Sequence, residues 1–243
     1  MTDVQTAPTD ALNTIASGGG ADVCAISIAH YPLIADVYQM LPHGGSMGEG
    51  YGPILVTREP RSLESLRGER VAIPGTTTSA WATLKLVIDV DPVTVPIAPY
   101  ELTFEVLRSG DVEAALLIHE GRLTYDALGF HKVLDLGEWW AEQTGGLPLP
   151  LGGNTIRRSL GEDVIEEVSR DLYRSIEHAL DNREDSIQWL LTQSSALKTR
   201  DEVSEYLDMY ANGRTLDYGS EGRQGIARFL ERIGLSGEVD YAP

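Results

Sequence analysis

The stretch AALLIHEGRLTY, residues 114–125, begins as a buried strand and ends in groups that titrate or carry charge. Its first five residues are apolar, and they run directly into His119, Glu120 and Arg122. A short apolar run of this kind is typical of a strand in a sheet that is covered on both faces. The polar end allows two interpretations: the strand reaches solvent there, or it opens onto a site in which an imidazole takes part in chemistry.

Strands and helices alternate on both sides of this stretch. Short apolar runs predict strands at 21–29, 52–58, 70–75 and 112–118. Apolar residues at helical spacing predict helices at 76–88 and at 103–110, the second closed by Gly110. This alternation predicts an α/β protein with a mostly parallel sheet. Such sheets bind ligands at the carboxyl ends of their strands, and His119 directly follows one of those ends.

The chain becomes mainly helical after the extended segment LPLPLG at 147–152. Ser159 and Glu162 have the spacing of a capping box before an amphipathic segment that continues to Leu180. Further helices are predicted near 184–194, 201–211 and 221–233, the last ended by Gly234.

The composition is that of a globular protein. The chain has 243 residues, of which 42% are hydrophobic and 23% charged. Its first residues do not form an export signal, and nowhere do about 18 apolar residues run together. We therefore expect a cytoplasmic protein with no membrane partner. Cys24 is the only cysteine, so no intrachain disulfide can form, and we expect its thiol to pack as a small hydrophobe.

The net charge of −18 limits the partners of the protein. An excess of acidic residues repels nucleic acid and anionic lipid, so neither is an expected partner. Lysine occurs only at Lys85, Lys132 and Lys198. Acid excess with little lysine is typical of proteins kept soluble in a salt-rich cytosol, and an ordinary acidic enzyme is the alternative.

Hydroxyl side chains gather where the strand predicted at 70–75 gives way to a helix. In IPGTTTSAW they belong to Thr76, Thr77, Thr78 and Ser79. Unpaired N–H groups at a helix N-terminus, with side-chain donors beside them, form a site for a carboxylate or phosphate. Simple N-capping by one of the four residues is an equally supported alternative.

Two further segments could line the same cleft. HGGSMGEGYGP, at 43–53, is too rich in glycine for a regular element and lacks the Lys-Ser/Thr ending of a phosphate-binding P-loop. YANGRTLDYG, at 210–219, puts Asn212 between two predicted helices, where the usual role of asparagine is a helix cap.

His119 is the candidate catalytic residue. A single histidine in an α/β protein is more often structural than catalytic, but the position at the end of an apolar strand favours function. The histidines without that setting are His30, His43, His131 and His178. No pair of histidines has metal-ligand spacing, and neither GxSxG nor GxGxxG occurs. We therefore expect no metal, no nucleotide cofactor and no serine-hydrolase chemistry.

Several motifs together resemble one enzyme family. They are LLIHEGRLTY, VLDLGEWW, TGGLPLPLG, GGSMGEGYGPILV, IPGTTTSAW and YANGRTLDYGSEG. The family is that of the 1,4-dihydroxy-6-naphthoate synthases of the futalosine route to menaquinone, and the resemblance covers about residues 10–235. It implies the α/β fold of type II periplasmic binding proteins, with two lobes that close over a ligand in the cleft between them. It also implies a lyase that converts cyclic dehypoxanthine futalosine to 1,4-dihydroxy-6-naphthoate without a cofactor.

The resemblance also assigns roles to residues. His119 matches the histidine that serves the family as general base, and the family's substrate-contacting strand end resembles Ala25, Ile26 and Ser27. The family's Thr-Thr pair falls on Thr78 and Ser79, a difference that keeps both hydroxyls. With Thr77 and Asn212 from the segments above, these residues make up the predicted substrate-binding set. The expected partner is a small carboxylated substrate, and the expected state is a monomer or a homodimer.

The lobes are predicted from the prolines that follow strands. Residues 1–58 and 151–243 should form one lobe and residues 59–150 the other, because Pro60 follows one strand and the proline-rich segment at 147–152 is stiff enough to cross back. Members of the family begin with a further strand, a helix and a Pro-Asn-Asp-Thr loop. This chain is expected to start after them, which leaves a sheet edge unpaired.

Two other functions are compatible with the same fold. A solute-binding protein would bind its ligand tightly without turnover, and chorismate dehydratase, another enzyme of the pathway, would act on chorismate. The export signal expected of the first was not found, and the His-Glu-Gly-Arg and Leu-Pro-Leu-Pro-Leu-Gly stretches argue against the second.

Overall fold

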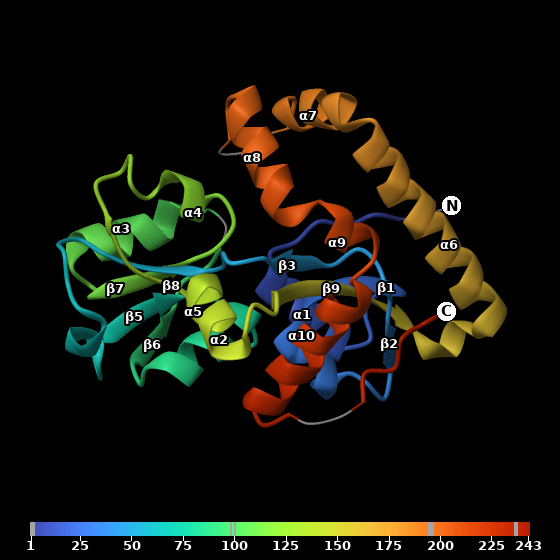
Figure 1. Cartoon of the computed structure of the whole chain (residues 1–243), viewed down its shortest axis with the longest axis horizontal. Helices are drawn as coiled ribbons and strands as arrows, with labels where there is room; N and C mark the ends of the chain where they lie inside the picture. The colour runs from blue at the N-terminus through green and yellow to red at the C-terminus, as the bar shows by residue number, and fades with distance from the viewer. Residues whose placement is uncertain (1–2, 98, 100, 194–196, 236–237) are drawn as a thin grey trace.

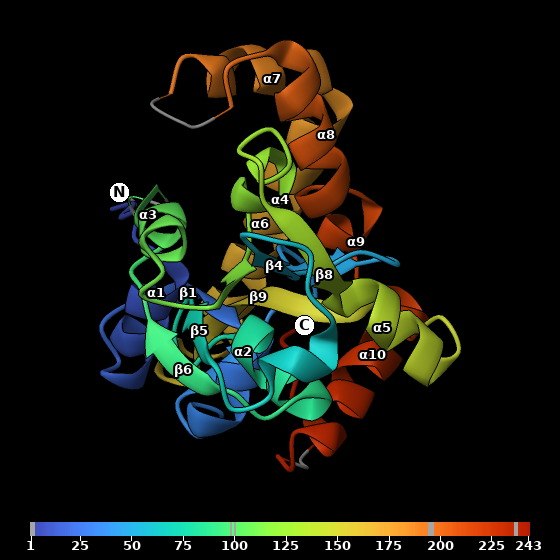
Figure 2. The same ribbon diagram turned by 90° about the vertical axis from the view of Figure 1, so that its left-hand side faces the viewer.

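Two β-sheets organise the chain. The structure is a computed structural model, and the part of it described here comprises residues 3–97, 99, 101–193, 197–235 and 238–243. Figure 1 shows the two sheets side by side, with a long helical excursion above one of them. The view from the side in Figure 2 shows that helices cover the sheets on both faces. The predicted α/β class is confirmed.

The described strands of the first sheet pair with one another in the antiparallel direction, and an isolated parallel bridge joins Met40 to Tyr241. These strands are β1 (Val23–Ser27), β2 (Tyr38–Met40), β3 (Ser46–Gly48) and β9 (Leu149–Arg157). The long strand β9 pairs with each of the other three. Strand β3 lies inside the segment at 43–53, which we had expected to contain no regular element. The glycines of this segment permit close approach: a Cβ on Gly45 would lie 2.2 Å from the Tyr218 ring.

The second sheet is mixed and has the strand order β6-β5-β7-β4-β8. Its strands are β4 (Ile54–Thr57), β5 (Arg70–Ile73), β6 (Asp91–Thr94), β7 (Ala114–Leu117) and β8 (His131–Asp135). Only the pairs that β5 makes with β6 and β7 are parallel among the described strands, whereas β4 runs antiparallel to β7 and β8. The prediction of a mostly parallel sheet was therefore wrong, because an apolar run shows that a strand is buried but not which way its neighbour runs.

The passage between the sheets falls earlier than the predicted boundary. Strand β4 pairs with β7 and β8, so residues 54–57 belong to the second sheet, although we had assigned them to the first lobe. The chain leaves the first sheet at 49–53, between β3 and β4, and returns through β9. Pro60 marks the end of a strand rather than a change of sheet. The division into two lobes itself stays a prediction.

Ten α-helices connect and cover the described strands. They are α1 (Thr9–Ser17), α2 (Ser79–Val87), α3 (Glu101–Ser109), α4 (Gly121–Thr124), α5 (Leu136–Thr144), α6 (Glu162–Asp181), α7 (Arg183–Leu191), α8 (Arg200–Tyr210), α9 (Gly213–Leu216) and α10 (Gly219–Arg232). Three short 3₁₀ helices, η1 (Ile28–Leu33), η2 (Leu63–Leu66) and η3 (Arg158–Leu160), complete the described elements. No helix in the described ranges is both long and apolar enough to cross a membrane.

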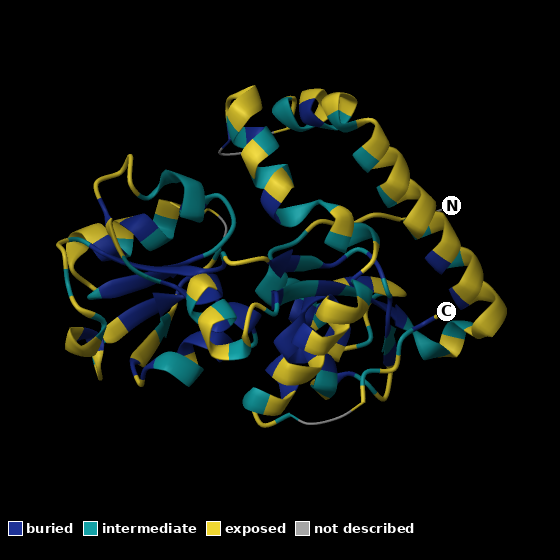
Figure 3. Cartoon of the chain, viewed as in Figure 1, coloured by how far each residue is buried: buried dark blue, intermediate teal, exposed yellow. Residues whose placement is uncertain are grey.

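Helices α6, α7 and α8 form an arch over the first sheet. Figure 3 shows α6 exposed along most of its length, whereas α7 has exposed, intermediate and buried residues. The arch returns at α8, and Leu123 of α4 packs there against the apolar cluster of Ile187, Leu197 and Val203. The far end of the arch therefore contacts the segment that follows β7.

The helix ends match the sequence in part. Gly110 and Gly234 have positive φ and follow α3 and α10, as predicted. The predicted capping box of Ser159 and Glu162 was wrong, because Gly161 is the N-cap of α6 and makes no side-chain capping bond. A capping box forms instead before α8, where Thr199 and Glu202 bond each other's backbone N–H groups.

One apolar cluster joins the two sheets. It includes Ile26 and Met40 of the first sheet, Leu55 and Leu116 of the second, and the fully buried Trp140 of α5. A second cluster lies on the other face of the second sheet, against α3. Cys24 is buried in the first cluster, as expected for a structural thiol. The contact between the sheets is therefore apolar, and it fixes the elements that surround the site described next.

Candidate active site

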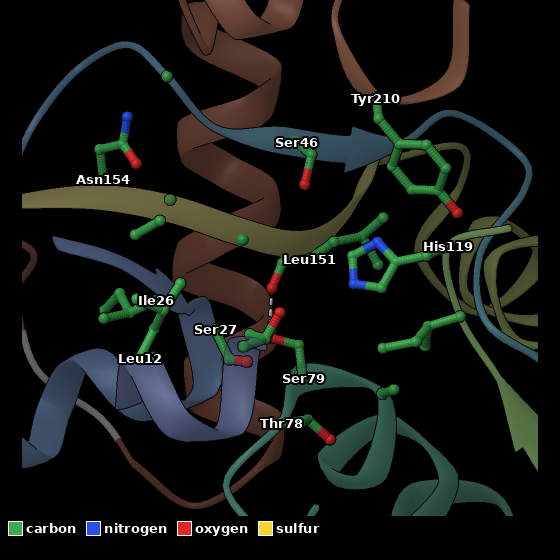
Figure 4. A pocket seen from close by; sticks show the side chains of 17 residues that line it. Leu12, Ile26, Ser27, Ser46, Thr78, Ser79, His119, Leu151, Asn154 and Tyr210 are labelled. Atoms are coloured by element: carbon green, nitrogen blue, oxygen red, sulfur yellow. Dashed lines mark hydrogen bonds between the residues drawn. The ribbon is translucent and has the colours of Figure 1, made fainter. Parts of the chain in front are cut away.

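A cavity of about 210 Å³ lies where the two sheets meet. Figure 4 shows its wall, to which the first sheet contributes β1, β3 and β9. The start of α2, the end of β7 and the last residue of α8 close the opposite side. Residues far apart in the sequence therefore meet around one space of the size of a small ligand.

Six of the eight predicted site residues line this cavity. They are Ala25, Ile26, Ser27, Thr78, Ser79 and His119. Thr77 does not line it, and its hydroxyl accepts a hydrogen bond from Asn13 at 3.0 Å. Asn212 is also outside, because its side-chain oxygen caps α9 by accepting from Arg214 N at 2.9 Å. The alternative of a plain asparagine cap is confirmed for Asn212.

The start of α2 combines a cap with free backbone donors. Thr78 is the N-cap, and its hydroxyl accepts from Trp81 N and donates to the carbonyl of Gly75 at 2.8 Å. Ser79 and Ala80 are the first two helical residues and line the cavity. The first N–H groups of a helix have no acceptor within the helix, so this end can bind an anionic group.

The Ser79 hydroxyl links the two sheets. It donates to the carbonyl of Leu151 on β9 at 2.7 Å and accepts from the backbone N–H of Ala29 at 3.2 Å. Because α2 follows a strand of the second sheet, this hydroxyl connects that sheet to the first across the cavity. A ligand that forms a hydrogen bond with Ser79 would therefore contact a residue that is bonded to the first sheet and attached to the second.

His119 leaves the strand in an unusual conformation. Its φ is +50°, and it is the only residue other than glycine with positive φ in the described part of the chain. Such a conformation costs a residue with a Cβ free energy and is found at functional sites more often than elsewhere. The Tyr206 hydroxyl lies 3.5 Å from Nδ1 of His119, and the Tyr210 ring centroid lies 6.0 Å from that of the imidazole.

The protein environment keeps the imidazole neutral. Burial lowers the pKa of His119 below the ordinary value for histidine, and the charge of the neighbouring Glu120 opposes this effect. A neutral imidazole has one nitrogen lone pair that can accept a proton. At neutral pH His119 is therefore in the state that a general base requires.

The arginine of the same stretch is structural. Arg122 donates to Asp135 at 2.5 Å and to the carbonyl of Gly52 at 2.7 Å, and it does not line the cavity. Asp135 is fully buried and its other carboxylate oxygen accepts from Gly137 N at the start of α5. His119 therefore reaches the cavity, and its part in chemistry stays a prediction, while Arg122 joins the following turn to the segment that crosses between the sheets.

Sequence reasoning missed several residues of the site. Asn13 on α1 is fully buried, and it bonds the backbone N–H of Ser27 and both the carbonyl and the hydroxyl of Thr77. It thereby joins the β1 end to the loop before α2. Ser46 on β3 and Asn154 on β9 also line the cavity (Figure 4). Ser46 lies in the segment at 43–53, which was expected to line the cleft, although the residue itself was not named. No local pattern marked Asn13 or Asn154, and α1 itself was not predicted.

No metal site is evident in the described ranges. No group of three or more histidine, cysteine, aspartate or glutamate side chains is placed there to hold an ion. The candidate chemistry of the cavity therefore rests on an imidazole, hydroxyls, amides and helix N–H groups.

The fold, with a cavity where the two sheets meet, is similar to that of type II periplasmic binding proteins. The alkanesulfonate-binding protein SsuA from Xanthomonas axonopodis pv. citri superimposes with a TM-score of 0.64 over 96% of this chain and 83% of its own. Its sequence identity is 14%, so the likeness is one of fold alone. Protein AF1704 from Archaeoglobus fulgidus is more similar, with a TM-score of 0.86 and 36% identity over 93% of this chain and 83% of its own.

The sequence comparisons identify the family. A family model described as menaquinone biosynthesis matches residues 2–234. The 1,4-dihydroxy-6-naphtoate synthase of Thermus thermophilus is 39% identical over 245 residues, covering 100% of this chain and 85% of that enzyme. The chain therefore belongs to the menaquinone biosynthesis family that contains the 1,4-dihydroxy-6-naphthoate synthases, and it is an enzyme. The resemblance inferred from the motifs is confirmed.

Proposed function

We propose that this enzyme converts cyclic dehypoxanthine futalosine to 1,4-dihydroxy-6-naphthoate and that His119 is its general base. The observation that carries the proposal is the position of the His119 ring in the cavity, opposite the start of α2. Figure 4 shows one ring nitrogen directed into the cavity, on the side of Ser79. Membership of the family supports the identity of the substrate, and this geometry supports the role of His119 as the base.

The reaction needs a proton acceptor beside a held substrate. It forms a second aromatic ring as the sugar-derived fragment departs, and a carbon-bound proton is removed on the way. An imidazole with a pKa at or below the neutral range can accept that proton. General-base catalysis contributes about 100- to 10,000-fold, so orientation of the substrate in the cavity must supply much of the remaining acceleration.

The start of α2 is the proposed carboxylate site. The N–H groups of Ser79 and Ala80 can donate to a carboxylate, and the positive end of the helix dipole favours a negative charge there. Because Thr78 already donates its hydroxyl proton to Gly75, the expected contacts are the two backbone N–H groups and the Ser79 hydroxyl. The Ser79 hydroxyl can exchange its bond to Leu151 for one to the substrate.

Ser79→Ala tests this carboxylate site. We expect KM to rise by about 10-fold while kcat changes little, because a hydrogen bond to a charged group is present in both the substrate complex and the transition state. Steady-state kinetics should be compared with Ser65→Ala, which removes an exposed hydroxyl bonded to the Ser62 carbonyl away from the cavity. An unchanged KM in Ser79→Ala counts against the assignment.

The substrate itself can be tested by product analysis. The enzyme should be incubated separately with cyclic dehypoxanthine futalosine and with chorismate, and the products separated by chromatography. Formation of 1,4-dihydroxy-6-naphthoate from the first and no reaction of the second is the expected result. Dehydration of chorismate contradicts the proposal, as does tight binding of either compound without turnover, which is the behaviour of a solute-binding protein.

A further inference from the structure

We propose that Tyr206 is a positioning residue of this reaction. Its hydroxyl oxygen accepts the Nδ1 proton of His119 and so leaves Nε2 unprotonated on the side of the cavity. The inference rests on the proposed role of His119 as general base. It adds a residue of α8 that contacts the imidazole at Nδ1.

The two imidazole nitrogens have different surroundings. Nδ1 lies 3.5 Å from the Tyr206 hydroxyl, at the outer limit of a hydrogen bond. Within the described part of the chain, the Tyr206 hydroxyl makes no other hydrogen bond. The nitrogen away from Nδ1 is directed into the cavity (Figure 4). A neutral imidazole carries one proton, and the partner of one nitrogen decides which of the two nitrogens holds it.

A general base needs its lone pair on the nitrogen that faces the substrate. If Tyr206 donated to Nδ1, the imidazole proton would reside on Nε2, and the cavity-side nitrogen could not accept a proton. If Tyr206 accepts from Nδ1, the Nε2 lone pair is free and the imidazolium formed on proton transfer keeps the same partner. Only the second arrangement is compatible with catalysis by His119.

Helix α8 is itself held firmly against this site. Arg183 of α7 donates to the Ser204 carbonyl at 2.7 Å and to the Asp208 carboxylate at 2.6 Å. Tyr51, in the segment that crosses between the sheets, donates to the Met209 carbonyl at 2.5 Å. These contacts hold α8 against α7 and against the segment that crosses between the sheets. They therefore fix the position of Tyr206.

The turn that carries His119 is held by the same helix. Leu123 and Tyr206 pack on the same apolar cluster of α7 and α8, and the rings of Tyr206 and Tyr210 lie 4.7 Å apart. The positive φ of His119 needs such support, because an unsupported residue would relax from that conformation. Helix α8 therefore positions both the backbone and the ring of His119.

The charged and titratable groups around the imidazole are consistent with a neutral pair. The groups that face it are Glu120 on its own segment and Tyr206 and Tyr210 on α8. Burial raises the pKa of Tyr206 and of Tyr210, with the charge of Glu120 acting in the same direction. Tyr206 is therefore a neutral phenol, whose hydroxyl oxygen can accept a hydrogen bond while the hydroxyl keeps its own proton.

Tyr206→Phe tests the inference because it removes the hydroxyl and keeps the ring that packs against the cluster of Ile187, Leu197 and Val203. We expect kcat to fall by about 10-fold with KM unchanged and with an unchanged thermal midpoint. Nitrogen NMR of the histidine-labelled enzyme above pH 7 should show the Nδ1–H tautomer of His119 in the wild type and a mixture of tautomers in Tyr206→Phe. Tyr173→Phe, which removes a hydroxyl from the exposed face of α6, is the matched control and should leave both readouts unchanged.

The outcomes separate this inference from the proposed function. An Nε2–H tautomer in the wild type overturns the role of Tyr206, and so does normal turnover of Tyr206→Phe. A fall in thermal midpoint with no change of tautomer or of kcat shows a structural role only and overturns it equally. The tautomer is read without substrate, whereas failure of the proposed function appears as normal turnover in an enzyme that lacks His119.

Discussion

His119→Asn should lower the turnover number by about 100-fold or more and leave substrate binding and the fold intact. Asparagine reaches about as far as Nδ1 of the imidazole, can still hydrogen-bond Tyr206, and tolerates the positive φ of this position better than other residues with a Cβ. It cannot accept a proton near neutral pH. The loss should therefore appear in kcat and not in KM.

Turnover and thermal midpoint should be measured on the same preparation of His119→Asn. His131→Asn is the matched control, because His131 is exposed at the start of β8 and does not line the cavity. If His119 were only a structural histidine, the variant would lose about 1 to 3 kcal/mol of stability and its folded fraction would turn over normally. A folded variant with wild-type turnover would remove His119 from the mechanism.

Gly137→Ala should destabilise the protein by about 3 kcal/mol, which corresponds to a fall of roughly 6 to 12 °C in thermal midpoint for a chain of this size. A Cβ on Gly137 would lie 1.9 Å from the carbonyl carbon of Tyr51 and 2.5 Å from the backbone nitrogen of Gly52. Both neighbours are backbone atoms of the segment that crosses between the sheets. The strain therefore cannot be relieved by rotating a side chain.

The same substitution at Gly213 is the control for Gly137→Ala. A Cβ on Gly213 meets nothing within 4 Å, and this glycine does not have positive φ. Gly213→Ala should change the free energy of unfolding by no more than about 1 kcal/mol, in the stabilising direction. Equal thermal midpoints for Gly137→Ala and the wild type would show that the crossing can move aside without cost.

The elements were predictable where one local property decides them. The run before His119 was predictable as a buried strand because all its side chains are apolar. Helices α6 and α10 were predictable from the helical spacing of their apolar residues. Strand direction was not predictable in this way. β1 and β7 are both short apolar runs, yet β1 pairs antiparallel with β9 and β7 has one parallel and one antiparallel neighbour.

The residues that line the candidate site were predictable in part from motifs, whereas their supporting contacts were not. His119 and Ser79 stand at a strand end and at a helix start, which are places that chemistry uses on any α/β fold. Tyr206 reads in sequence as one more residue of an amphipathic helix, and it meets His119 across 87 positions of the chain. Asn13 similarly gains its role from partners that lie near it only after folding. Contacts between residues so far apart in the sequence depend on how the whole chain packs, so no local sequence pattern predicts them.

The pH dependence of naphthoate formation tests the role of His119 most directly. Burial lowers the pKa of His119 from the ordinary 6.5, and the base acts only when it is deprotonated, so activity is present above that lowered pKa and is lost as the pH falls through it. We predict that kcat/KM of the wild type falls on the acid side with an apparent pKa below about 6.5, and that the residual activity of His119→Asn lacks this acid limb. The same acid limb, unshifted, in His119→Asn would contradict the account, because the ionisation that controls the reaction would then belong to another group.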